Sequence, residues 1–153
     1  MNFSAIEQSV LNHAHQILES RIKEQDSHYF TNPDLVKDFV TLHFAKFERE
    51  VFSVLFLNSQ HRLIKIEDMF FGSIDTASVY PREVVKRALE LNSAAVIFSH
   101  NHPSGVGEPS HSDEKITKRL VEALLLMNIR VLDHLVVGDS VVSFAERGLI
   151  SSD

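Results

Sequence analysis

Two histidines, a serine and an aspartate lie close together between residues 99 and 113. His100 and His102 follow the apolar run 94–98, which is typical of a buried strand, so we expect both in extended chain just past the strand end. Side chains two residues apart in extended chain point the same way, so two imidazoles can converge on one metal ion. Asp113 opens a helical pattern after two prolines and can supply a third ligand. Three protein ligands leave a fourth position for water, as in catalytic zinc sites.

A second His-x-His pair serves as an internal control for this motif. His13 and His15 have the same spacing, but they lie in residues 6–18, whose apolar periodicity is typical of an amphipathic helix. Side chains at positions i and i+2 of a helix diverge. We therefore expect this pair to form part of a solvated helix face rather than a metal site.

Structural explanations exist for each residue of the proposed site taken alone. His100 and His102 can cap a strand, and Ser110 with Asp113 matches the capping pair at the start of a helix. Their combination, with a rigid Pro-Ser-Gly turn between the two parts, favours a metal site.

A hydrolytic zinc site also needs a group that accepts a proton from water and relays it to the leaving group. Glu50 directly precedes the apolar run 51–57, which is a candidate central strand and would carry this carboxylate to the edge of the sheet. The alternative is that Glu50 belongs to a charged helix end. Glu108 lies in the metal loop itself, but the flexible Gly-Val-Gly segment before it makes it a poorly held base.

Asp133 and His134 form a further candidate pair within an apolar strand pattern. A histidine next to an aspartate in a strand is usually a structural pair, or a residue that supports a metal ligand from behind. If His134 reached the metal itself, it would close the fourth position and indicate a structural site.

The composition is that of an ordinary globular protein of one domain, with 153 residues, 44% of them hydrophobic and 24% charged. The chain has no cysteine, so any metal must be held by His, Asp or Glu. The formal charge of −6 argues against direct nucleic-acid binding. No apolar stretch is long enough to span a membrane and the N-terminus lacks a signal pattern, so a cytoplasmic protein is expected.

The hydrophobic patterns alternate between helices and strands, and two strand pairs joined by short turns exclude an all-parallel sheet. The predicted class is α/β, a mixed sheet flanked by helices. The expected helices are 4–24, a second beginning at Pro33 and including Phe47, a third from Pro81 to Leu91, and 112–127; the expected strands are 51–57, 62–71, 94–98, 130–137 and 141–144.

Glu50, His100-x-His102 and Ser110-x-x-Asp113 together resemble the JAMM motif of the MPN family of zinc-dependent isopeptidases. Further segments of the chain are similar to bacterial RadC-like proteins. The resemblance extends from about residue 32 to residue 150, and the segments that carry it are 49–52, 79–89, 100–105, 133–138 and 143–146.

The resemblance implies a JAMM fold with a curved mixed sheet, and one zinc ion bound by His100, His102 and Asp113. It implies Glu50 as the general base and Ser110 as the residue that stabilises the oxyanion. Residues 1–31 are then an N-terminal helical extension and residues 32–153 the RadC-like JAMM/MPN domain, in a form that lacks the upstream helix-hairpin-helix region of full-length RadC proteins. The expected function is a zinc metallohydrolase that cleaves a peptide or isopeptide bond in a peptide or protein substrate.

Two other functions remain open from the sequence. One is a non-catalytic module, stabilised by zinc, that mediates interactions in a DNA-repair or mobile-element complex. The other is a nuclease or a deaminase, which only the analogy of layered folds favours. The deaminase signature also needs a cysteine pair that this chain lacks.

Overall fold

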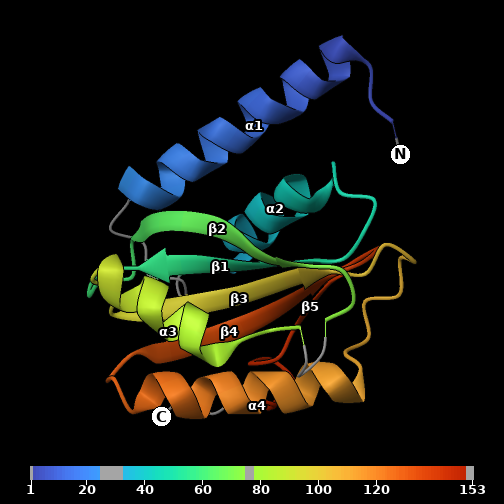
Figure 1. Cartoon of the computed structure of the whole chain (residues 1–153). Coiled ribbons are helices and arrows are strands. Elements are labelled where there is room, and N and C mark those ends of the chain that lie inside the picture. The colour runs from blue at the N-terminus through green and yellow to red at the C-terminus, as the bar shows by residue number, and fades with distance from the viewer. Residues whose placement is uncertain (1, 25–32, 75–77, 151–153) are drawn as a thin grey trace.

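The computed structural model describes residues 2–24, 33–74 and 78–150. They form a five-stranded sheet with helices on both sides (Figure 1). In chain order the elements are α1 (Ala5–Glu24), α2 (Pro33–Phe44), β1 (Val51–Leu57), β2 (Leu63–Phe71), α3 (Pro81–Glu90), β3 (Ala95–Asn101), α4 (His111–Leu125), β4 (Arg130–Val137) and β5 (Val141–Ser143).

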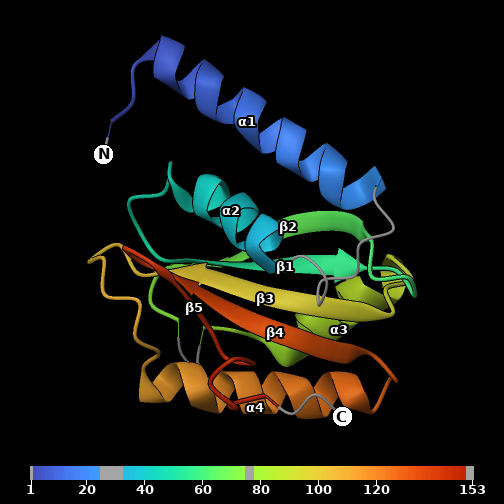
Figure 2. The same cartoon turned by 180° about the vertical axis from the view of Figure 1, so that it is seen from behind.

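The sheet is mixed, with strand order β2-β1-β3-β4-β5. β3 and β4 are parallel and are connected through α4, whereas the other neighbouring strands are antiparallel. Both views show α1 and α2 on one side of the sheet and α3 and α4 on the other (Figures 1 and 2). This arrangement confirms the predicted α/β class with a mixed sheet flanked by helices.

Alternate residues of the central strands supply two separate hydrophobic cores. Phe52 and Phe98 point to the α3/α4 side, where they pack with Leu120, while Leu55 and Ile97 point to the α1/α2 side. Because a strand alternates its side chains between two faces, a nearly continuous apolar sequence such as β1 is buried on both. His100 has the same parity as Phe98 along β3 and therefore lies on the α3/α4 side.

Most predicted element boundaries agree with the structure within a few residues. Pro81 begins α3, and Asn92, after its end, has a positive φ of 53°, as expected of a residue that closes a helix. α2 ends at Phe44, so the prediction that Phe47 extends this helix is wrong. β3 continues to Asn101, and His100 therefore lies within the strand rather than past its end.

The N-terminal helix α1 packs mainly against α2, and Ile22 reaches the core on that side of the sheet. The predicted domain boundary between residues 31 and 32 falls outside the described residues and stays a prediction. Among the helices that the structure describes, none combines the length and apolar character that a membrane crossing requires.

Candidate metal centre

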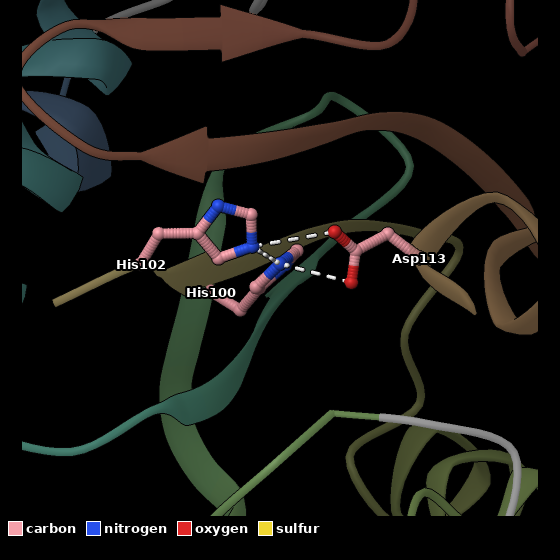
Figure 3. Close-up of side chains that lie close together, drawn as sticks. All are labelled: His100, His102 and Asp113. Carbon is pink, nitrogen blue, oxygen red and sulfur yellow. Dashed lines mark hydrogen bonds and ion pairs between the residues drawn. The ribbon is translucent and has the colours of Figure 1, made fainter. Parts of the chain in front are cut away.

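His100, His102 and Asp113 come together between the end of β3 and the start of α4 (Figure 3). The Nε2 atoms of the two histidines are 3.1 Å apart. Nε2 of His100 is 3.3 Å from one carboxylate oxygen of Asp113, and Nε2 of His102 is 3.3 Å from the other. We call these three residues the metal cluster, because they are the group among the described residues whose donor atoms converge closely enough to hold one ion.

A capping box at the N-terminus of α4 orients Asp113. The Ser110 hydroxyl oxygen accepts a hydrogen bond from the Asp113 amide, and Oδ2 of Asp113 accepts one from the Ser110 amide. These reciprocal bonds satisfy two amide groups that would otherwise lack partners at a helix start. They also fix the carboxylate, with 2% of its side chain exposed, so that it faces the histidines. The capping role and the role in the metal cluster are therefore compatible.

Hydrogen bonds behind the rings determine which histidine nitrogens face the cluster as lone pairs. Nδ1 of His102 lies 2.6 Å from the Val106 carbonyl oxygen, which can only accept, so Nδ1 carries the hydrogen. A neutral ring then presents the lone pair of Nε2 to the cluster. Neighbouring ligands of a tetrahedral zinc ion lie about 3.3–3.4 Å apart, given bonds of about 2.0–2.1 Å. The observed spacing of 3.1–3.3 Å fits an ion of this kind.

Electrostatics in the metal cluster favour a positive charge at the point where the three side chains meet. Burial acts to raise the pKa of Asp113, but its hydrogen bonds with His100 and His102 outweigh burial and hold the pKa well below its ordinary value. The pKa of His102 is raised, chiefly by its hydrogen bond with Asp113 and to a smaller extent by the charge of Glu50. A cation between these groups, whether metal or proton, is stabilised by the same carboxylate.

Strand register explains how Glu50 comes near the cluster from fifty residues away. β1 and β3 are antiparallel, with Phe52 opposite His100. The pairing stops there, so Glu50 leaves the start of β1 beside the end of β3 that leads to His102, close enough for its charge to act on the pKa of His102. Oε2 of the half-buried Glu50 accepts a hydrogen bond of 2.9 Å from the amide of Ile74, which holds the carboxylate in place.

Asn101, between the two histidines, is a site residue that our sequence reasoning missed. Its side-chain oxygen accepts a hydrogen bond of 2.7 Å from the amide of Val51, and its Nδ2 donates to the carbonyl of Arg49 at 3.0 Å. Asn101 therefore clamps the backbone on both sides of Glu50 to the end of β3. The signal for this role was its position between the histidines, where its side chain points away from theirs.

The other two loop residues considered from the sequence, Glu108 and Ser110, are exposed. Glu108 is exposed and forms an ion pair with Arg147, which lowers its pKa. Ser110 is bonded to Asp113 of the cluster, and this capping bond uses a lone pair of its hydroxyl oxygen, so the hydroxyl hydrogen stays available for donation. Of the three cluster residues, His102 has the most exposed side chain, at 14%, so access is from its side.

Asp133 and His134 do not pair with each other through their side chains. Asp133 accepts hydrogen bonds from the Ser143 hydroxyl and the Ala145 amide, on the α1/α2 face of the sheet. His134 is fully buried on the opposite face, and its Nε2 lies 2.7 Å from Nδ1 of His100. Burial, followed by the nearby His100, lowers the pKa of His134 well below its ordinary value. His134 therefore contacts the back of a cluster histidine rather than the point where the three ligand atoms meet.

The other His-x-His pair diverges as predicted, but only one member is solvated. His13 is exposed, whereas His15 is half-buried, with its Nε2 3.2 Å from Nδ1 of His43 on α2. The prediction of a solvated face is therefore wrong for His15. Its partner comes from a different helix, which the helical pattern could not indicate.

A mixed sheet of this order, with His-x-His at the end of an internal strand and an aspartate at the start of the next helix, defines a domain of the JAB (JAMM/MPN) class. The family model of the RadC-like JAB domain matches residues 30–149, and the chain belongs to this family.

Curated relatives agree with this membership. Two UPF0758 proteins of Vibrio cholerae serotype O1 are 53% and 54% identical to the chain over 142 and 144 residues, which cover 93% and 94% of the chain and 89% and 90% of the relatives. A UPF0758 protein of Thioalkalivibrio sulfidiphilus is 54% identical over 143 residues, or 94% of the chain and 63% of that protein. The chain thus spans most of the Vibrio relatives and less than two thirds of the third.

Proposed function

We propose that this protein is a zinc-dependent hydrolase that cleaves an amide bond in a peptide or protein, of the peptidase or isopeptidase type. The observation that carries the proposal is the convergence of three ligand atoms, with the Glu50 carboxylate near His102 and one side of the cluster open to solvent. His100, His102 and Asp113 would hold one Zn²⁺ ion. Three protein ligands leave room for water, which is typical of catalytic rather than structural zinc.

A bound zinc ion supplies Lewis acidity, which lowers the pKa of a coordinated water to about 7 and polarises a substrate carbonyl. We assign Glu50 as the general base: with Oε2 held by the Ile74 amide, the other carboxylate oxygen accepts the proton from water and delivers it to the leaving nitrogen. The Ser110 hydroxyl donates a hydrogen bond to the oxyanion that develops on the carbonyl oxygen. Asn101 keeps the base in position through the backbone on either side of it.

The choice of Glu50 over Glu108 follows from how the two carboxylates are held. Arg147 binds Glu108 at the surface, and the lowered pKa makes Glu108 a weaker proton acceptor. Glu50 is half-buried and close enough to His102 to influence its pKa. A peptide or protein substrate is favoured over a nucleic acid because the chain carries a formal charge of −6.

Glu50→Gln provides the first test. We expect the variant to keep one zinc per chain, measured by elemental analysis, and to lose about 10²–10⁴-fold in the cleavage rate of hits from a peptide and isopeptide library. The control is Glu108→Gln, which removes a carboxylate from the metal loop and should leave the rate unchanged. Undiminished turnover by Glu50→Gln would show that another group is the base.

The non-catalytic alternative makes a different prediction in the same experiment. A zinc-stabilised interaction module would bind zinc and cleave no member of the library, and metal removal would unfold the loop between β3 and α4. Such sites normally close the fourth position with a protein ligand. The part of the chain that the structure describes brings three ligand side chains together, and His134 contacts His100 from behind. The hydrolase is therefore the better-supported proposal.

A further inference from the structure

A chain of three hydrogen bonds runs behind the metal cluster, through the core between the sheet and α4. Nδ1 of His100 is 2.7 Å from Nε2 of His134, and Nδ1 of His134 is 2.6 Å from the Thr117 hydroxyl. The same hydroxyl donates to the carbonyl oxygen of Asp113 at 2.6 Å. The chain therefore begins at one residue of the cluster and ends on the backbone of another.

The hydrogens in this chain can be assigned one after another. Thr117 has a single hydroxyl hydrogen, and the Asp113 carbonyl can only accept, so that hydrogen is used there. Thr117 must then accept from His134, which places the His134 hydrogen on Nδ1.

The surroundings of His134 determine its charge. Its ring contacts Phe52, Phe98 and Phe144, with ring centroids 5.5, 5.9 and 4.6 Å away, and no part of the residue is exposed. A positive charge is costly in such an apolar position, so the neutral ring is the stable form. A neutral His134 with its hydrogen on Nδ1 presents a lone pair at Nε2, and His100 must donate its Nδ1 hydrogen to that lone pair.

We infer that Thr117 and His134 are positioning residues that hold His100 in the tautomer with hydrogen on Nδ1 and a lone pair on Nε2, where the metal would bind. The inference rests on the proposed metal role of His100. Thr117 follows Asp113 by one helical turn, so α4 both carries one ligand and determines the tautomer of another. The tautomer of His102 is determined separately, by the hydrogen bond between its Nδ1 and the Val106 carbonyl in the loop.

Thr117→Val tests this inference, because valine keeps the shape of threonine and lacks the hydroxyl. His134 then loses the acceptor for its Nδ1 hydrogen and can instead carry the hydrogen on Nε2, from where it donates to Nδ1 of His100. His100 would then present Nε2–H to the metal position. Thr117→Ser is the matched control, because it restores the hydroxyl.

The primary measurement is the tautomer of His100 and His134 in zinc-free protein, from long-range ¹H–¹⁵N spectra of histidine-labelled samples at pH 8. We expect both residues with hydrogen on Nδ1 in the wild type and in Thr117→Ser, and a shift toward Nε2–H in Thr117→Val. A wild-type His134 with hydrogen on Nε2 would overturn the inference. This result does not depend on catalysis, so it stays informative if the protein hydrolyses nothing.

The second measurement is the dissociation constant for Zn²⁺, by competition with a chromophoric chelator. We expect Thr117→Val to bind zinc about 10–100-fold more weakly than the wild type, as is typical when the support of a ligating histidine is removed. Thr117→Ser should stay close to the wild type. Equal weakening in both variants would contradict the inference, and thermal melts of the zinc-free proteins will show whether either variant has lost its fold.

Discussion

Groups of side chains that include two histidines each lie on both faces of the sheet. The two groups differ in their balance of hydrogen-bond donors and acceptors. On the α3/α4 face lies the metal cluster. On the α1/α2 face, His15 contacts His43, and Asp68 accepts from both His43 and Ser53 through the same carboxylate oxygen, at 2.6 Å each. We call these four residues the α2-side network.

Every contact in the α2-side network joins a hydrogen to a lone pair. Burial acts to raise the pKa of Asp68, but hydrogen bonds from His43 and Ser53 outweigh burial and lower it, so the carboxylate is ionised at neutral pH and only accepts. His43 therefore donates through Nε2, and one hydrogen lies between its Nδ1 and Nε2 of His15. The pKa of His15 is lowered, first by burial and then by His43, as expected for a neutral ring.

The metal cluster has an excess of acceptors instead. The backing groups use the Nδ1 hydrogens of His100 and His102, so two lone pairs and a carboxylate face one another. Such an arrangement favours a cation at its centre, either a metal ion or a proton. The number of histidines therefore does not distinguish a metal site from a structural network, whereas the balance of donors and acceptors does.

Removal of the carboxylate from the metal cluster should have the largest effect. Asp113→Asn keeps an oxygen that can accept from the Ser110 amide, so α4 stays capped, but the negative charge opposite the two histidines is lost. We expect zinc affinity to fall by more than about 100-fold, beyond the loss typical of supporting residues. Chelator competition measures the affinity, and circular dichroism checks the helix content. Zinc binding at wild-type strength would show that Asp113 is not a ligand.

The matching change in the α2-side network, Asp68→Asn, should affect stability and leave zinc affinity unchanged. The loss of charge-assisted hydrogen bonds from His43 and Ser53 should cost about 1–2 kcal/mol at pH 7. The pKa of Asp68 in the folded protein lies below its ordinary value of 3.8. The greater stability of the wild type over Asp68→Asn is therefore present in full above a pH of about that value.

The difference in stability between the wild type and Asp68→Asn should disappear as the pH falls through the lowered pKa of folded Asp68, because the protonated carboxyl then resembles the amide. Urea unfolding of both zinc-free proteins between pH 7 and pH 2.5 measures the difference. A difference that stays constant down to the lowest pH would mean that the charge of Asp68 contributes nothing.

The smallest effect is expected at the edge of the α2-side network, in His15→Ala. This change removes one hydrogen bond and a stacked contact with Phe39, whose ring centroid is 4.6 Å away, and should cost about 1 kcal/mol. Hydrogen exchange should become faster in α1 and stay unchanged in β3 and α4. His13→Ala, on the exposed side of the same helix, is the control and should match the wild type. Equal exchange rates in both variants would show that the contact with His43 does not hold α1.

The sequence alone determined most of the elements and the ligand set proposed for the metal. The apolar run before His100, the helix-starting Pro81 and the Ser110-x-x-Asp113 spacing are local signals, because each reflects the backbone preferences of a few consecutive residues. Local signals also separated the two His-x-His pairs, since side chains two apart converge in a strand and diverge in a helix. They could not indicate that His15 has a partner on α2.

Tertiary structure decided which distant residues join the site. Glu50 comes near His102 because β1 and β3 are antiparallel and pair up to Phe52 opposite His100, two residues from each. In β4, Val131 and Val136 lie on the same face although strict alternation would separate them, because the register shifts by one residue between Val131 and Asp133. This irregularity turns His134 toward His100. Strand register depends on contacts between segments far apart in the chain, so local sequence patterns cannot specify it.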